Sequence, residues 1–190
     1  MHRERLELLL ASGRNGEAIE VLRHANRDLI SLAERLVAAG LGDMADDVMD
    51  QHPAVLDSNA GDLRKWLVKR GRIEPNALDQ LVRALDHFTY SPLVGTWHRL
   101  HAEAEKSGRW QQLLPRALAA VNNELRNAQP ARARILAMAG RFAEAETVLA
   151  RLAEGAWKSA ALDVAAAAES TRPDLARVLY TRIGNNLRAR

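Results

Sequence analysis

The stretch GRFAEAETVL, residues 140–149, decides the fold of this chain, because residues 13–22, GRNGEAIEVL, repeat it at six of ten positions. A glycine followed by an arginine also occurs at Gly71 and Gly108, and a related turn occurs at Gly40. Successive glycines of this set are 27, 31, 37 and 32 residues apart, which is the length of one helical hairpin. The sequence therefore predicts a helical hairpin repeated along the chain.

Each recurring residue type of this turn has a physical role in ending one helix or beginning the next. A glycine adopts the left-handed backbone conformation that ends many helices and that other residues resist. The acidic residue, Glu17 or Glu144, then lies in the first turn of the next helix, near the positive end of its dipole. Ala18 and Ala145 are small enough for the two helices of a hairpin to approach closely.

Prolines and apolar spacing complete the helix map. Four prolines precede amphipathic segments and suit the first position of a helix: Pro75, Pro92, Pro130 and Pro173. Pro53 is expected to close a helix, and Pro115 should bend its helix or delay its start. The pattern predicts about twelve helices, near residues 2–12, 17–26, 28–39, 43–52, 60–70, 75–89, 92–107, 110–123, 130–139, 142–153, 156–168 and 173–188.

The fold class follows from this map. No segment alternates long enough to indicate a strand, and no linker rich in Gly, Pro or Ser divides the sequence. A short hairpin cannot bury its own apolar face, so neighbouring hairpins must stack. We expect an all-α chain with one domain over residues 1–190. It should be an α-α superhelix, or solenoid, of about six stacked hairpins with a concave surface.

The composition excludes several classes of protein. The chain has no cysteine, which removes disulfides, thiolate nucleophiles and thiolate metal sites, and suits the cytoplasm. No apolar run reaches the ~18 residues of a membrane span, and Glu4 and Glu7 argue against a signal peptide in residues 1–13. The sequence contains no phosphate loop, no G-x-G-x-x-G and no G-x-S-x-G. We therefore expect no catalysis, no cofactor and no membrane partner.

Two families share features with these residues. The turn with Gly140, Phe142, Glu144 and Ala145 resembles the inter-helix turn of tetratricopeptide repeats, in which glycine, an aromatic residue and alanine are hallmarks. Trp110 after Gly108 fills the same aromatic position. The resemblance covers the turns and implies a helical-repeat scaffold that binds a protein or peptide.

The second half, residues 90–183, resembles the helical region that follows the zinc site in bacterial SWIM zinc-finger proteins. The similarity lies in residues 90–100, 108–110, 116–118, 140–145 and 169–183. It implies a bacterial helical scaffold attached to a zinc module that binds nucleic acid or protein. This chain lacks the cysteines for that module. Because solenoids often belong to longer proteins, one hypothesis is that the chain is a fragment.

Three clusters offer chemistry, each with a plainer explanation. His98, His101 and Glu105 lie within two turns of one predicted helix. They could bind a metal, form a partly exposed polar flank of the helix, or make a polar contact on the concave face. The aspartates of residues 43–50 indicate a solvated acidic face or a patch for a basic partner. The four tryptophans fit core packing better than base stacking, with Trp157 the least explained.

The charge leaves two functions open. The net charge is +3, but arginine predominates over lysine, which indicates a coding bias more than a phosphate-binding adaptation. The leading hypothesis is a non-catalytic scaffold that binds a protein or peptide partner in a concave groove. The alternative is a nucleic-acid-binding helical repeat that uses arginines for phosphates. The residues predicted to bind are polar residues on first helices: Lys65, Lys69, His98, His101, Arg132 and Arg134.

Overall fold

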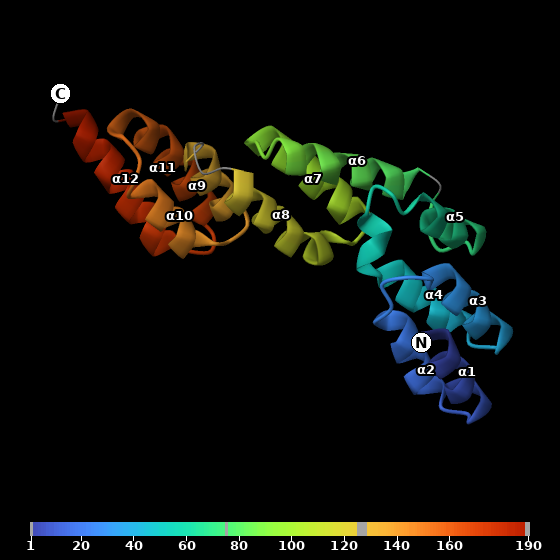
Figure 1. Cartoon of the computed structure of the whole chain (residues 1–190). Coiled ribbons are helices and arrows are strands. Elements are labelled where there is room, and N and C mark those ends of the chain that lie inside the picture. The colour runs from blue at the N-terminus through green and yellow to red at the C-terminus, as the bar shows by residue number, and fades with distance from the viewer. Residues whose placement is uncertain (1, 75, 125–128, 189–190) are drawn as a thin grey trace. The chain divides into compact units, whose positions relative to one another are not determined.

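The computed structural model describes residues 2–74, 76–124 and 129–188, and over these ranges the chain is helical without any strand (Figure 1). Within them lie twelve α-helices and one short 3-10 helix, η1 (Pro53–Leu56). The α-helices, in chain order, are α1 (His2–Ala11), α2 (Asn15–Arg23), α3 (Leu29–Ala38), α4 (Gly42–Gln51), α5 (Gly61–Lys69), α6 (Ala77–Tyr90), α7 (Val94–Lys106), α8 (Trp110–Glu124), α9 (Gln129–Met138), α10 (Phe142–Leu149), α11 (Glu154–Ala168) and α12 (Pro173–Arg188). The all-α class predicted from the sequence is confirmed.

The predicted helices each overlap one observed helix, with differences at the ends. Pro53 closes α4 as expected, but it also begins η1, which the sequence pattern did not predict. The prediction that Pro115 delays its helix is wrong, because α8 begins at Trp110 and carries Pro115 in its second turn. The ring of Pro115 is exposed, so it displaces no packed side chain there. Pro75 lies outside the described residues.

The glycines of the turns have the predicted backbone. Gly13, Gly40, Gly71, Gly108 and Gly140 all have positive φ angles, between 65° and 81°. At each turn, the residue after the glycine donates its backbone N–H to the carbonyl of the residue five positions before itself, at 2.8–3.0 Å. This bond and the left-handed glycine together form a Schellman motif, which satisfies carbonyls at the helix end. The same turn geometry therefore occurs five times along the chain.

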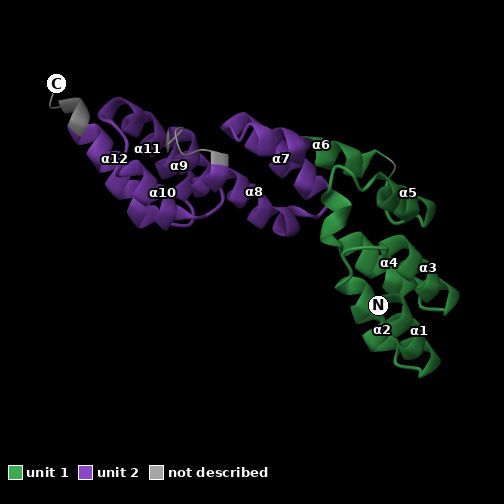
Figure 2. Cartoon of the chain, in the orientation of Figure 1, with its two compact units in different colours: residues 1–83 green, residues 84–190 purple. Residues whose placement is uncertain are grey.

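The chain divides into two compact units, residues 1–83 and residues 84–190 (Figure 2). In the first unit α2 packs against α1, α3 and α4, and α5 packs against α3 and α4. Large side chains with almost no exposed surface fill its interior, among them Leu6, Leu22, Leu32, Leu36, Met49 and Leu67. The prediction of a single domain over the whole chain stays a prediction.

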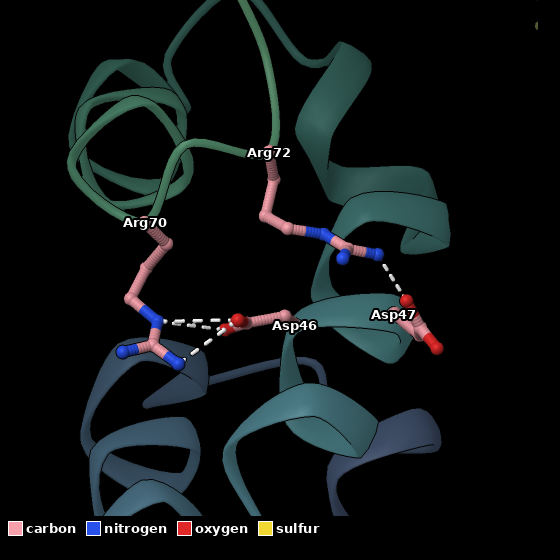
Figure 3. Close-up of polar contacts among 4 residues, drawn as sticks. All are labelled: Asp46, Asp47, Arg70 and Arg72. Carbon is pink, nitrogen blue, oxygen red and sulfur yellow. Dashed lines mark hydrogen bonds and ion pairs between the residues drawn. The ribbon is translucent and has the colours of Figure 1, made fainter.

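One aspartate of α4 contradicts the predicted solvated acidic face. The side chain of Asp46 is only 6% exposed and accepts hydrogen bonds from Arg70, which follows α5 (Figure 3). The bonds join Arg70 Nε to Oδ1 at 2.9 Å and Arg70 Nη2 to Oδ2 at 2.9 Å. These hydrogen bonds raise the pKa of Arg70 above its ordinary value, so the guanidinium remains charged. Asp43 and Asp47, in contrast, are exposed as expected.

In the second unit α9 packs against both α10 and α11, and α11 packs against α12. A continuous apolar cluster joins these four helices, and alanines supply many of its members. Trp157 lies in this cluster, with the guanidinium of Arg182 over its ring at 4.4 Å. The predicted core position of Trp157 is therefore confirmed. None of the described helices of the chain is both long and apolar enough to cross a membrane.

A series of ring contacts connects α6, α7 and α8 within the second unit. Trp97 lies between Phe88, at a centroid distance of 5.6 Å, and Trp110, at 5.1 Å. The ring of His101 also contacts Trp110, at a centroid distance of 4.5 Å. Trp97 and Phe88 are buried, and Trp110 is half-buried. These aromatic side chains therefore serve as packing between helices, as expected for Trp97.

Candidate binding site beside helix α5

A cavity of about 410 Å³ lies beside α5 in the first unit. Its volume falls within the range typical of ligand pockets, roughly 300–1,000 Å³. It is lined by residues of α5, of the turn after it and of the start of α6: Gly61, Arg64, Lys65, Val68, Lys69, Ile73, Leu78 and Asp79. Two of the predicted binding residues, Lys65 and Lys69, thus line one cavity.

Arg64 forms a fixed wall of this cavity. Its side chain is 13% exposed, and Nε donates to Asp79 Oδ1 at 3.0 Å. Its Nη1 also donates to the backbone carbonyl of Asp57 at 2.8 Å, just after η1. Arg64 therefore ties α5 to the start of α6 and to the end of η1. Because its charge is paired with Asp79, it contributes little free positive charge to a ligand.

The two lysines are differently engaged. Lys65 Nζ donates to Asp62 Oδ1 at 3.1 Å, in an i,i+3 pair whose side chains are more than 80% exposed. Such exposed pairs contribute about 0–1 kcal/mol and exchange readily for another carboxylate. Among the residues that the structure describes, Lys69 has no ion pair and no side-chain hydrogen bond. The ammonium group of Lys69 is therefore available to a ligand.

Apolar side chains complete the cavity. Val68, Ile73 and Leu78 lie in its lining, from α5, the following turn and α6 respectively. Ile73 and Leu78 were not predicted from the sequence. They follow the left-handed Gly71, and only the path of the chain through that turn brings them back beside α5. The signal that could have found them is the run of apolar residues on both sides of that glycine. The cavity thus combines an apolar surface with two lysines.

The other four predicted residues belong to the second unit. Arg134 is engaged with α11, because Nη2 donates to Ser159 Oγ at 2.6 Å and Nε lies 2.6 Å from Asp163 Oδ2. Arg132 Nη2 donates to Asn122 Oδ1 of α8 at 2.9 Å. These arginines hold neighbouring helices together, which leaves them less available to a partner.

The two predicted histidines lie on α7, which packs against α8 and α9. His98 is exposed, whereas His101 is half-buried against Trp110 and lies 4.0 Å from Glu105. Within the described part of the chain, no group of three or more His, Asp or Glu side chains could hold a metal ion. The contacts of His101 agree with the reading of a polar flank.

Two other described cavities are weaker candidates for a binding site. In a cavity of about 510 Å³ both cations, Arg141 and Arg172, are paired, with Glu144 and Asp174, whereas the cavity beside α5 also holds Lys69, which has no ion pair with a described residue. A cavity of about 530 Å³ beside α3 and α5 has three acidic residues, Asp28, Glu34 and Asp62, against the single base Arg27, and it holds none of the predicted binding residues. The cavity beside α5 is therefore the best candidate for a binding site.

No family model matches the sequence, and no curated protein and no solved structure matches the chain either.

Proposed function

We propose that this chain is a non-catalytic helical-repeat scaffold that binds a protein or peptide partner. The proposal includes serial stacking of the hairpins into an α-α superhelix of the tetratricopeptide kind. Five turns of the same Schellman geometry support it, as does the packing of consecutive helices inside each unit. The absence of cysteine supports a cytoplasmic location.

The observation that carries the proposal is the cavity beside α5. Its lining holds the ammonium group of Lys69, which has no partner among the described residues, next to the aliphatic side chains of Val68, Ile73 and Leu78. Polar groups at the rim of an apolar depression are typical of sites that receive a side chain of a partner. The described lining residues include no serine, threonine or histidine, so they supply no hydroxyl nucleophile paired with an imidazole base. Binding is therefore a better explanation than catalysis.

A display selection tests this function. The full chain is immobilised and challenged with a random peptide library, and the enriched peptides are resynthesised and measured by fluorescence anisotropy. We expect saturable binding by a family of related peptides. The function is rejected if repeated selections enrich no peptide that binds the full chain in solution.

The nucleic-acid alternative is tested with the same assay. Labelled single-stranded RNA and double-stranded DNA replace the peptide, and salt is varied. A nucleic-acid-binding repeat predicts binding that weakens steeply with salt as phosphate contacts release counterions. Tighter binding of an oligonucleotide than of any selected peptide would make nucleic acid the ligand and would replace the scaffold proposal.

A further inference from the structure

The cavity beside α5 has a definite charge pattern. Its lining carries three cations, Arg64, Lys65 and Lys69, and one anion, Asp79, which is bound to Arg64. The two lysines are therefore the charges that remain for a ligand. They lie one helical turn apart, so their stems emerge from the same face of α5 about 6 Å apart along the axis. Two carboxylates at a similar spacing would complement them.

The apolar part of the lining specifies a second feature of the ligand. Val68 lies between the two lysines in sequence, and Ile73 and Leu78 face the same cavity. Leu78 is almost fully buried and forms the floor, whereas Val68 and Ile73 are half-buried, so a ligand that carries only charge would leave the exposed apolar surface of these two uncovered. A large aliphatic side chain next to the carboxylates would cover it, at about 25 cal/mol for each Å² removed from water.

The lining also discriminates against nucleic acid. Single strands are bound by basic grooves with aromatic side chains on which bases stack, and no aromatic side chain lines this cavity in the part of the chain that the structure describes. The one arginine, which could grip a phosphate with two parallel hydrogen bonds, already donates to Asp79 and to the carbonyl of Asp57. An acidic peptide fits what is left.

We infer that the partner segment received beside α5 is an acidic peptide with a large aliphatic side chain, its carboxylates on Lys65 and Lys69 and its aliphatic group on Val68 and Ile73. This inference rests on the proposed scaffold function and names the chemistry of the partner. Because exposed ion pairs exchange readily, the Asp62 contact of Lys65 yields to a carboxylate of the peptide.

The test uses the full chain and a labelled, end-blocked peptide in which glutamates surround a single leucine. K65E/K69E should weaken binding on the order of tenfold or more, since two attractions become two repulsions. The chain supplies a matched control in its remaining two lysines. Lys106 pairs with Glu103 at i,i+3 as Lys65 pairs with Asp62, and Lys158, like Lys69, has no ion pair or side-chain hydrogen bond with another described residue. K106E/K158E should leave binding unchanged.

Changes in the peptide complete the test. A peptide with lysines in place of the glutamates should prefer K65E/K69E to the unaltered chain. Replacing its leucine with serine should weaken binding on the order of tenfold, because the aliphatic contact is lost. Circular dichroism confirms that each variant remains helical.

Several results would overturn the inference. One is equal binding of the glutamate peptide by K65E/K69E and the unaltered chain, and another is equal binding of a glutamine version of the peptide. An oligonucleotide that displaces the peptide and depends on the same two lysines would also overturn it. If the display selection enriches peptides that are not acidic, this inference fails while the scaffold function stands. If the selection enriches none, the scaffold function itself fails.

Discussion

Residues 1–83 and residues 84–190 are built from the same kind of helical hairpin, but different contacts join the hairpins in the two units. In the first unit, arginines of a helix or of the turn after it pair with a carboxylate of another helix, and the described residues include four such pairs: Arg35 with Glu7, Arg64 with Asp79, Arg70 with Asp46 and Arg72 with Asp47. In the second unit Arg134 pairs with Asp163 in the same way, but most described contacts between helices are apolar, through the alanine-rich cluster of α9 to α12 and the aromatic series of α6 to α8.

The two kinds of contact respond differently to substitutions and to salt. A close-packed apolar interior depends on the volume of its side chains and is insensitive to salt. Ion pairs between helices depend on the charge of both partners and on how far each is shielded from water. Both units have a close-packed apolar interior and should be sensitive to changes in side-chain size, but the first unit should be more sensitive to changes in charge than the second.

The largest effect is expected in the second unit, from Trp97→Ala. Trp97 is 2% exposed and contacts the rings of Phe88 and Trp110. Removing an indole from such a position leaves a cavity and costs about 3–5 kcal/mol of unfolding free energy. Denaturant unfolding followed by circular dichroism measures the loss. Leu162→Ala, at a half-exposed position on α11, is the control and should change stability by less than about 0.5 kcal/mol. Equal losses in both variants would contradict this view of the second unit.

The first unit offers two neighbouring aspartates that differ in burial (Figure 3). Asp46→Ala removes a buried partner of Arg70 and should cost about 1–3 kcal/mol, because the guanidinium, 33% exposed, is left partly buried without an acceptor. Asp47→Ala removes the partner of Arg72 at a site where the aspartate is 62% exposed, and should cost about 0–1 kcal/mol. Urea unfolding of both variants at low and high salt separates the two cases. A loss for Asp47→Ala as large as that for Asp46→Ala would remove burial as the deciding factor.

These aspartates also mark where sequence reasoning ends. Glycine, proline and apolar spacing are local signals, and they located the helices and the five left-handed turns. Asp46 and Asp47 are adjacent and chemically identical, and the register of α4 places Asp46 nearer to the buried face of Ala45, Val48 and Met49. Nothing within α4, however, identifies the partner of Asp46, which is Arg70, 24 residues later and beyond another helix. Contacts between hairpins leave no local pattern, so the sequence could not predict this pair.

Only part of the candidate site could be predicted from the sequence. Lys65 and Lys69 were selected as polar residues on one helix face, and both line the cavity beside α5. The partners that give the cavity its character, Ile73, Leu78 and Asp79, lie beyond a turn whose path determines whether they return to α5. For Arg132 and Arg134, the contacts with α8 and α11 likewise depend on packing that no spacing rule specifies.

A smaller effect, with opposite signs, is expected in the stretch shared by the two units. Gly13→Ala should destabilise the chain by about 1–2 kcal/mol, because Gly13 has a φ of 70° that a side chain resists. Gly16→Ala should stabilise it by up to about 1 kcal/mol, since Gly16 lies inside α2 with ordinary φ and open space at its Cβ position. The second unit already has alanine at the equivalent position, Ala143. Thermal unfolding of both variants checks the signs, and destabilisation by Gly16→Ala would show that the two stretches are not equivalent.

The smallest effect concerns an exposed pair of the second unit, where charge is expected to matter least. Hydrogen bonds from Arg172 lower the pKa of Asp174 from 3.8 to about 2. The folded carboxylate thus holds its charge to lower pH than the unfolded one. Its contribution to stability is complete above about pH 4 and is lost as the pH falls toward 2. NMR titration of the Asp174 side chain measures this pKa, and Arg172→Gln should return it toward the ordinary value. The thermal midpoint of the Arg172→Gln variant at neutral pH should stay nearly unchanged, because salt and water screen a pair at this position. A large fall in that midpoint would show that the second unit, too, depends on charge pairs.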